Sequence, residues 1–184
     1  MEGLTLYIIV GIIALVIIYV LLTLNKLIKL NNKVKEAFAT MDVYLKKRWD
    51  LIPNLVETVK GYAKHESETL ESIIAARNNY AKLSTSEKLS SNEEISSSLT
   101  KLFALAESYP DLKANKNFLD LSKQLTAVED EIAHSRKYYN GSVRQFNNQI
   151  EMIPSNIVAL IFGFKSKAMF EASEEEKQSI KVDL

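Results

Sequence analysis

The feature that most constrains the fold is a run of 21 residues without a charged side chain, Leu4–Leu24. As an α-helix, at about 1.5 Å per residue, it would be roughly 30 Å long, the thickness of a bilayer's hydrocarbon core. A cleavable signal peptide has a basic start and a shorter apolar stretch before small residues. Here Glu2 precedes the run and Leu-Thr-Leu-Asn ends it. The run therefore predicts a membrane anchor, with the lipid bilayer contacted by Leu4–Leu24.

Basic residues on one side of this run predict its orientation. The N-terminal side of the run offers only the amino terminus. The other side is followed closely by four lysines: Lys26, Lys29, Lys33 and Lys35. Because basic flanks stay on the cytoplasmic side, we expect a single-pass protein of the cell membrane, with a short N-terminus outside and a cytoplasmic C-terminal domain. The chain as a whole has 23 Lys and Arg against 23 Asp and Glu. No basic stripe carries interleaved aromatic residues, so we expect no nucleic-acid partner.

The remainder of the chain has the pattern of long helices. It has few turn formers, with 5 Gly and 3 Pro in the whole sequence, and no useful strand alternation. The first apolar stripe consists of Leu27, Leu30, Val34, Ala37, Met41, Leu45 and Trp49. Pro53 lacks an amide hydrogen and disfavours helical geometry at Ile52, which predicts a kink or break and then a helix from about Pro53 to Leu83. Its stripe is Leu55, Val56, Val59, Tyr62, Ala63, Leu70, Ile73 and Ile74.

A serine-rich segment separates these helices from the next one. Residues 84–98 contain seven serines, which favours an exposed loop because serine competes for backbone hydrogen bonds. Ser91 and Glu94 have capping-box spacing and predict the start of the next helix. Its apolar face is Ile95, Leu99, Leu102, Phe103 and Ala106, and Tyr109-Pro110-Asp111 should end it.

The longest helical pattern comes last and should end at Pro154. It consists of Phe118, Leu121, Leu125, Val128, Ile132, Ser135, Tyr139, Ser142, Phe146 and Gln149. The small or polar members predict either close approach of a neighbouring helix or partial contact with solvent. Gly141 within this helix should cost about 1 kcal/mol relative to alanine. We therefore predict an all-α fold, with one N-terminal transmembrane helix followed by an elongated antiparallel bundle of three to four long helices.

Two short regions follow the long pattern. Ile157–Phe164 is too short to span a bilayer. We expect it to pack against the bundle, and contact with the membrane or a partner is the alternative. Residues 171–184 form an acidic tail. The expected organisation is an anchor at 1–24, a helical bundle domain at 25–170 and the tail at 171–184.

Several reaction classes are excluded by residue type or spacing. The chain has no cysteine, so it forms no disulfide, zinc knuckle or thiol nucleophile. Its five glycines lie too far apart for a dinucleotide fingerprint, a phosphate-binding loop or a serine nucleophile elbow.

The two histidines do not complete a metal site. Glu131 and His134 have the Glu-x-x-His spacing of di-iron bundles, which need that motif twice. Tyr62 stands three residues before His65, so the second copy is missing. We expect Glu131 and His134 to be surface residues, and we expect no catalytic, cofactor-binding or metal-binding residue and no cofactor. A metal-dependent enzyme built on carboxylates and His134 is the alternative.

Five stretches of the sequence carry a family signature. They are VKEAFATMDVYLKKRWDLIPNLVETVKGYAKHE (34–66), SIIAARN (72–78), LFALAESYPDLKANKNFLDLSKQL (102–125), EIAHSRKYYNGSVRQFNNQI (131–150) and FGFKSKAMFE (162–171). Together with the single anchor they resemble the LemA family of membrane proteins from bacteria and archaea. The block at 50–66 is the most specific. The family often has Asp or Glu where this chain has Gly141.

The resemblance implies an all-α bundle behind one membrane helix and no accepted enzymatic activity. It further implies an association with membrane zinc metalloproteases, near which relatives are commonly encoded, and one branch takes part in building membrane organelles in magnetotactic bacteria. We therefore expect a non-enzymatic interaction or scaffold module at the membrane surface. Its partners would be membrane or membrane-associated proteins, including such a metalloprotease, or a second copy of the chain. The expected contact surfaces are 50–66 and the faces around Arg136 to Arg144, with direct membrane remodelling through Ile157–Phe164 as a further alternative.

Overall fold

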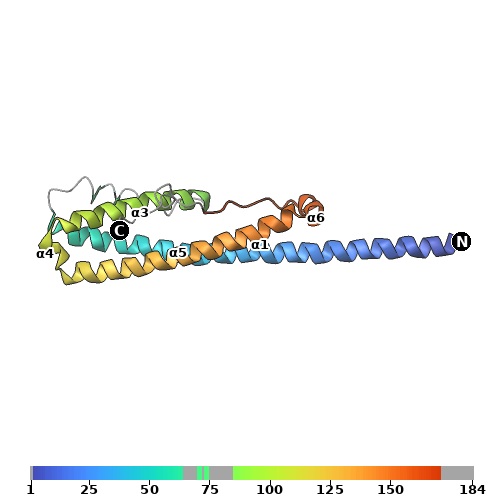
Figure 1. The fold of residues 1–184 in the computed structure, drawn as a ribbon, viewed down its shortest axis with the longest axis horizontal. Coiled ribbons are helices and arrows are strands. Elements are labelled where there is room, and N and C mark those ends of the chain that lie inside the picture. Colours follow the sequence, from blue (N-terminus) through green and yellow to red (C-terminus); the bar gives the residue numbers. More distant parts are fainter. Residues whose placement is uncertain (1, 64–69, 72, 75–84, 171–184) are drawn as a thin grey trace, which may run out of the picture. The chain divides into compact units, whose positions relative to one another are not determined.

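The computed structural model describes residues 2–63, 70–71, 73–74 and 85–170, and every regular element among them is helical (Figure 1). The helices are α1 (Glu2–Lys60), α3 (Thr85–Glu107), α4 (Pro110–Lys113), α5 (Lys116–Glu151) and α6 (Ser155–Ile161). The predicted all-α class is confirmed for this part of the chain. The acidic tail predicted at 171–184 and the histidine at position 65 lie outside the described residues.

The chain divides into two compact units, which are described separately here. Unit 1 consists of Met1–Ala39 and Lys137–Met169, and unit 2 of Thr40–Arg136 and Phe170–Leu184. Helices α1 and α5 therefore each contribute residues to both units.

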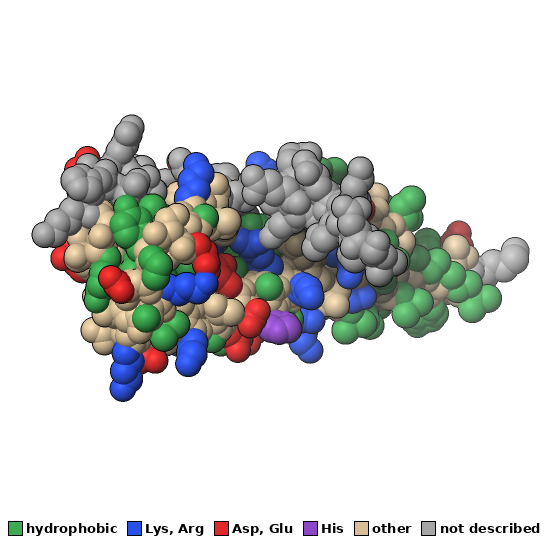
Figure 2. Space-filling model, turned by 60° about the vertical axis from the view of Figure 1, so that its left-hand side comes forward, with side chains coloured by type: hydrophobic (Ala, Val, Ile, Leu, Met, Phe, Trp, Pro, Cys, Tyr) green, Lys and Arg blue, Asp and Glu red, His purple; other side chains and the backbone are tan. Residues whose placement is uncertain are grey.

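The apolar run forms the N-terminal part of α1 in unit 1. This helix is long and apolar enough to cross a membrane, with an 18-residue window of mean hydropathy 2.9 and no buried residue in that window. Leu4 and Leu15, for example, are 70% and 68% exposed. Figure 2 shows these apolar side chains gathered at one end of the visible face (green). The helix is consistent with a single-pass membrane anchor.

Beyond the apolar run, α1 packs antiparallel against the end of α5 in unit 1. The Nζ atom of Lys33 donates a hydrogen bond to Oε1 of Gln145 at 3.0 Å. Further along α1, the Phe38 ring meets the Tyr139 ring edge-on, with 6.0 Å between centroids. The residue numbers of these contacts decrease along α5 as they increase along α1, so the two helices run in opposite directions. The buried side chains of unit 1 are Thr23, Leu27, Val34, Ala37, Tyr139, Ser142, Val143, Phe146, Ser155, Val158 and Ala159.

Unit 2 repeats this antiparallel pairing and adds α3 and α4. Arg48 on α1 pairs with Glu129 on α5, and Asn115 Nδ2 donates to the Tyr62 hydroxyl at 2.9 Å. The Oδ1 atom of Asn115 also accepts from the Phe118 amide at 3.1 Å, which caps the start of α5. The α1, α3 and α5 contribution to the core is Met41, Leu45, Trp49, Ile52, Leu55, Val56, Val59, Ile95, Leu99, Leu102, Ala106, Phe118, Leu125, Val128 and Ile132.

Of the kink or break predicted at Pro53, the break is wrong. Helix α1 continues through Pro53 to Lys60. An interior proline costs about 3 kcal/mol because it lacks an amide donor and crowds the preceding turn. Ile52, Leu55 and Val56 are all buried beside it, and each contributes roughly 1.5–3 kcal/mol. Burial of these three side chains thus offsets the local cost of the proline.

The continuous helix predicted from Pro53 to Leu83 is also wrong, because α1 ends at Lys60 and a turn follows at Gly61 and Tyr62. The Val59 carbonyl accepts from the amides of Tyr62 and Ala63, at 3.0 and 2.8 Å. Glycine weakens a helix by roughly 1 kcal/mol, so Gly61 favours termination here. Residues 70, 71, 73 and 74 are helical again, and positions 75–83 of the prediction lie outside the described residues.

The serine-rich loop predicted at 84–98 is wrong as well, and so is a helix start at Ser91. Helix α3 begins at Thr85 and includes residues 85–98, while position 84 lies outside the described residues. Serine costs only about 0.5 kcal/mol per helical position relative to alanine. The predicted apolar face is buried at Ile95, Leu99 and Leu102, which stabilises the helix by more than its serines destabilise it.

The long pattern on α5 is confirmed, and so is its end before Pro154. The end of α3 before Tyr109-Pro110-Asp111 is also confirmed. Ser135 and Ser142 are buried, at 5% and 2% exposure, and their hydroxyls donate to carbonyls of their own helix. Their burial favours close approach of a neighbouring helix over contact with solvent, whereas Gln149, the third such position, stays partly exposed.

Candidate functional site

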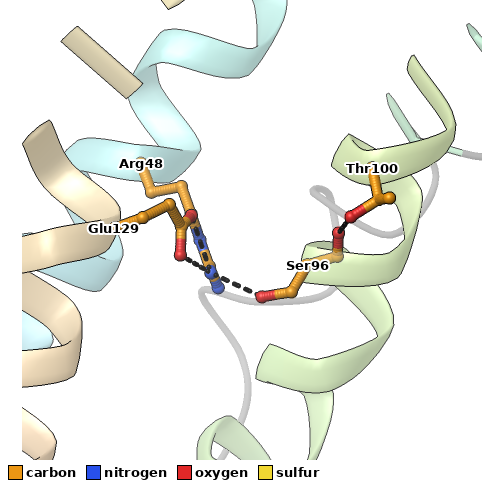
Figure 3. Close-up of polar contacts among 4 residues, drawn as sticks. All are labelled: Arg48, Ser96, Thr100 and Glu129. Carbon is orange, nitrogen blue, oxygen red and sulfur yellow. Dashed lines mark hydrogen bonds and ion pairs between the residues drawn. The ribbon is translucent and has the colours of Figure 1, made fainter. Parts of the chain in front are cut away.

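The most unusual side chain of unit 2 is a fully buried arginine. Arg48 has 0% exposure and lies on the buried face of α1 (Figure 3). Its Nη1 atom donates to both carboxylate oxygens of Glu129 on α5, at 3.2 and 3.3 Å, and to the Ser96 hydroxyl on α3 at 3.2 Å. One guanidinium therefore joins three helices of this unit.

The partners of Arg48 are less buried than the arginine itself. The Glu129 side chain is 37% exposed. Thr100, one turn after Ser96, donates from its Oγ1 to the Ser96 carbonyl at 2.9 Å (Figure 3). A groove of about 230 Å³ opens beside the ion pair, and its lining is Ser96, Leu99, Thr100, Phe103, Leu125, Thr126 and Glu129.

This arrangement fixes a positive charge beside a partly exposed carboxylate. Arginine stays protonated throughout the accessible pH range, so Arg48 cannot exchange protons with a substrate. Neither Ser96 nor Thr100 has a described histidine hydrogen-bonded to it, as an activated nucleophile requires. The cluster therefore positions α1, α3 and α5 of unit 2 against one another.

The residues considered for a metal site lie on the surface. Glu131 and His134 are exposed on α5, as predicted. Within the described ranges, no group of three or more His, Asp or Glu side chains could hold a metal ion. The second histidine of the sequence lies outside those ranges.

The first predicted contact surface, 50–66, is partly buried and partly exposed in unit 2. Ile52, Leu55 and Val56 point into the core, whereas Asn54 and Glu57 are exposed. A polar groove of about 400 Å³ lies along this exposed side, lined by Asn54, Glu57, Thr58, Asn117, Asp120, Leu121 and Gln124. Residues 64–66 of the block are outside the described part of the chain.

The second predicted surface, around Arg136 to Arg144, is divided between the units. In unit 2 the Arg136 guanidinium lies over the Phe170 ring, 4.3 Å from its centroid, a cation–π contact. In unit 1 Arg144 and Tyr138 are exposed and Tyr139 is buried. The Tyr139 hydroxyl donates to the Ala168 carbonyl at 3.0 Å, and burial raises the pKa of this hydroxyl above its usual value.

Unit 1 is strongly basic next to the apolar run. A groove of about 670 Å³ follows the run directly, lined by Asn25, Ile28, Lys29, Leu30, Asn32, Lys33, Glu36 and Tyr138. Apart from the N-terminal Glu2, the unit has only two acidic residues, Glu36 and Glu151. Its eight basic residues are Lys26, Lys29, Lys33, Lys35, Lys137, Arg144, Lys165 and Lys167.

Comparison with known proteins identifies the family of this chain. The model of the LemA family matches residues 37–184 of this chain, which is most of its length. The chain belongs to the LemA family. The match begins within α1, beyond the apolar run, and includes Arg48, Ser96 and Glu129 of the buried cluster.

Individual relatives support this membership. Protein LemA of Metamycoplasma hominis is 30% identical over 161 residues, which cover 85% of this chain and 72% of that protein. Magnetosome protein MamQ 2 of Paramagnetospirillum magneticum is 33% identical over 73 residues, 40% of this chain and 27% of that protein. Magnetosome protein MamQ of Magnetospirillum gryphiswaldense is 32% identical over 72 residues, 39% and 26% respectively. The chain thus matches about a quarter of each magnetosome protein.

The sequence interpretation of this LemA protein missed Arg48. A four-and-three spacing continued through the proline includes it, because the buried positions of α1 with this spacing are Met41, Leu45, Arg48, Ile52, Leu55 and Val59. The predicted stripe ends at Trp49 and omits Arg48, because charged side chains are rarely fully buried.

Proposed function

We propose that this LemA family protein is a single-pass membrane protein whose helical domain is a non-enzymatic interaction or scaffold module at the membrane surface. The observation that carries the proposal is the uncovered apolar part of α1. Side chains from Leu4 to Leu22 stay largely exposed, and leaving each large apolar side chain in water costs roughly 1.5–3 kcal/mol. A bilayer removes that cost, and α1 continues from the run into the folded helices without interruption.

A tethered module needs only modest intrinsic affinity, because anchoring raises the local concentration of partners in the same membrane. The polar groove along Asn54 and Asp120 offers a surface that the core does not use. Its exposed acids, Glu57 and Asp120, would suit a partner with basic or amide side chains. Partners of this kind include membrane proteins, a membrane zinc metalloprotease or a second copy of the chain.

Photo-crosslinking in native membranes tests the interaction. A crosslinking residue replaces Asn54 or Asp120 in the full chain, and Lys101, which is exposed on α3 and outside this groove, is the control position. We expect a reproducible adduct at the groove positions and little at Lys101. Recovery of monomer alone at both groove positions would show that this surface has no partner.

Thiol accessibility tests the orientation. The natural chain has no cysteine, so single cysteines at Asn54 or Lys101 give an unambiguous signal. We propose that the C-terminal domain is cytoplasmic, because the lysines follow the apolar run. Membrane-impermeant reagents should therefore label these sites only after lysis. Labelling in intact cells would reverse the topology.

Elemental analysis tests the non-enzymatic part of the proposal. We expect no stoichiometric transition metal in aerobically purified full-length protein, because Glu131 and His134 are exposed and have no second histidine motif. Iron, manganese or zinc at one or two equivalents would support the carboxylate-based enzyme.

A further inference from the structure

Helix α6 presents large apolar side chains to the outside of unit 1. Ile157, Leu160 and Ile161 are 58%, 82% and 70% exposed, and their i, i+3, i+4 spacing places them on one face. The flanking residues extend the same character, since Ile153 is 82% and Phe162 49% exposed. A short helix facing water would normally carry polar residues at such positions.

The opposite face of α6 is fixed to the unit. Ser155, Val158 and Ala159 are buried. The Ser155 hydroxyl lies 2.6 Å from the Gln149 carbonyl and 2.9 Å from the Met152 carbonyl, so it holds the helix against the end of α5. The exposed apolar face therefore belongs to a helix that is fixed to the rest of unit 1.

The segment after α6 strengthens this attachment. Gly163, at φ +70°, allows the amides of Gly163 and Phe164 to donate to the Leu160 and Ala159 carbonyls at 3.2 and 2.9 Å, a Schellman termination. The Phe164 ring then packs edge-on against Phe146.

Farther along, Asn147 makes two hydrogen bonds with the main chain of Lys167. The Asn147 Nδ2 atom donates to the Lys167 carbonyl and Oδ1 accepts from the Lys167 amide, both at 2.9 Å. The segment after α6 is thus attached to α5 at Phe164 and again at Lys167.

The register of unit 1 places α6 beside the end of the apolar run. Because Gln145 contacts Lys33 in the antiparallel pair, the end of α5 at Glu151 lies near Leu27 of α1, and α6 follows directly (Figure 1). The burial pattern agrees, since Thr23 and Leu27 are covered while their neighbours Leu22 and Ile28 are exposed.

The surroundings of α6 are basic. Lys26 and Lys29 on α1 and Lys165 after α6 are all exposed, and Glu151 is the acidic residue of this end of the unit. Apolar side chains among lysines at the end of a membrane span match the interface of a bilayer that contains anionic lipids.

We propose that the exposed face of α6, with Ile153 and Phe162, inserts into the interfacial region of the anionic bilayer that α1 spans. The chain thereby has a second, peripheral membrane contact, and the two contacts fix the orientation of unit 1 on the bilayer. The inference rests on the proposed function only in requiring that α1 be in the membrane.

Depth-dependent quenching tests this contact in the full chain. Single cysteines carry an environment-sensitive dye at Leu160 on α6, at Leu15 in the apolar run and at Val43, an exposed apolar position of α1 in unit 2. The proteins are reconstituted in vesicles of phosphatidylcholine with phosphatidylglycerol and in vesicles of phosphatidylcholine alone. Nitroxide lipids labelled near the headgroup or deep in the acyl chain act as quenchers.

In anionic vesicles we expect headgroup-level nitroxides to quench most of the fluorescence at Leu160 and none at Val43. Lys165→Gln should reduce the quenching at Leu160 toward its value in neutral vesicles. Quenching at Leu15 but not at Leu160 would overturn the α6 contact and leave the proposed function intact. Absence of quenching at Leu15 would overturn both. In a separate sample, an unlabelled Leu160→Cys variant is treated with a mild oxidant in anionic vesicles. A disulfide between two copies would instead assign this face to self-association and overturn the proposal.

Discussion

The ion pair of Arg48 and Glu129 predicts that its two partners respond unequally to removal. Arg48 is fully buried and the Glu129 side chain is 37% exposed. Glu129→Gln removes a counter-charge from a buried cation, whereas Arg48→Met removes the cation, keeps much of its volume and leaves a carboxylate that water can reach. Breaking a buried pair is costly mainly because of the charge that is left behind.

The distance gives the magnitude. At 3.2 Å, two unit charges attract by about 5 kcal/mol at an effective dielectric constant of 20, and by about 1 kcal/mol in water. Partial exposure of Glu129 places the pair between these limits. We expect Glu129→Gln to lower the free energy of unfolding by about 2 kcal/mol, and Arg48→Met to change it by less than about 1 kcal/mol.

Trp49 provides the assay. It is the single tryptophan of the chain, only 4% exposed, and it directly follows Arg48. Its emission during denaturant titration of the full chain in detergent reports unfolding of unit 2. Ser96→Ala, which removes one hydrogen bond to Arg48 without changing charge, is the matched control and should cost about 1 kcal/mol.

The double variant Arg48→Met/Glu129→Gln completes the cycle and should be more stable than Glu129→Gln alone. Moderate salt should leave the coupling energy nearly unchanged, because ions screen buried pairs weakly. If Arg48→Met proved more destabilising than Glu129→Gln, the reasoning from unequal burial would be refuted.

Three further outcomes are expected in the full chain. Asn147→Ala removes both hydrogen bonds to Lys167 and should cost about 2 kcal/mol, with faster amide exchange in 162–169, whereas Asn148→Ala at an exposed neighbouring position should do neither. Gly141→Ala should raise the free energy of unfolding by about 1 kcal/mol, because open space surrounds the new methyl group and alanine favours helix; a lower melting temperature would contradict this. Tyr139 keeps its proton to higher pH in the folded state than in the unfolded state, so stability should fall as pH rises above about 10, and Tyr139→Phe should lessen this fall in pH-dependent melting curves.

How far the fold could be predicted depended on whether local and tertiary preferences agree. On α5 the helical spacing continues from Phe118 to Phe146 with only Gly141 as a weak opposing signal, and the structure follows it. At Pro53 the local signal favours a break, but the buried neighbours hold the helix together. The serines of 84–98 favour a loop in the same way, but their small cost in helix stability is outweighed by the packing of Ile95 and Leu99.

The surface of α6 shows what a sequence pattern cannot decide. Ile157, Val158, Ala159, Leu160 and Ile161 are all apolar, so the spacing does not distinguish a buried face from an exposed one. The prediction that the segment packs against the bundle is confirmed for Val158 and Ala159, which are buried, and for Phe164, whose ring packs against Phe146. The assignment of faces follows from the long-range contacts that hold α6 in place, above all those of Ser155.

The distribution of charge between the units gives the two proposals different chemistry. Unit 1 has eight basic and three acidic residues, and since the chain has 23 of each, unit 2 has the remaining 15 basic and 20 acidic ones. Anionic lipid attracts the basic unit 1 and repels the acidic unit 2. The unit with the apolar run and α6 is therefore the one suited to the bilayer surface. The groove along Asn54 and Asp120 belongs to the acidic unit, where a protein partner with basic side chains would meet less competition from lipid headgroups.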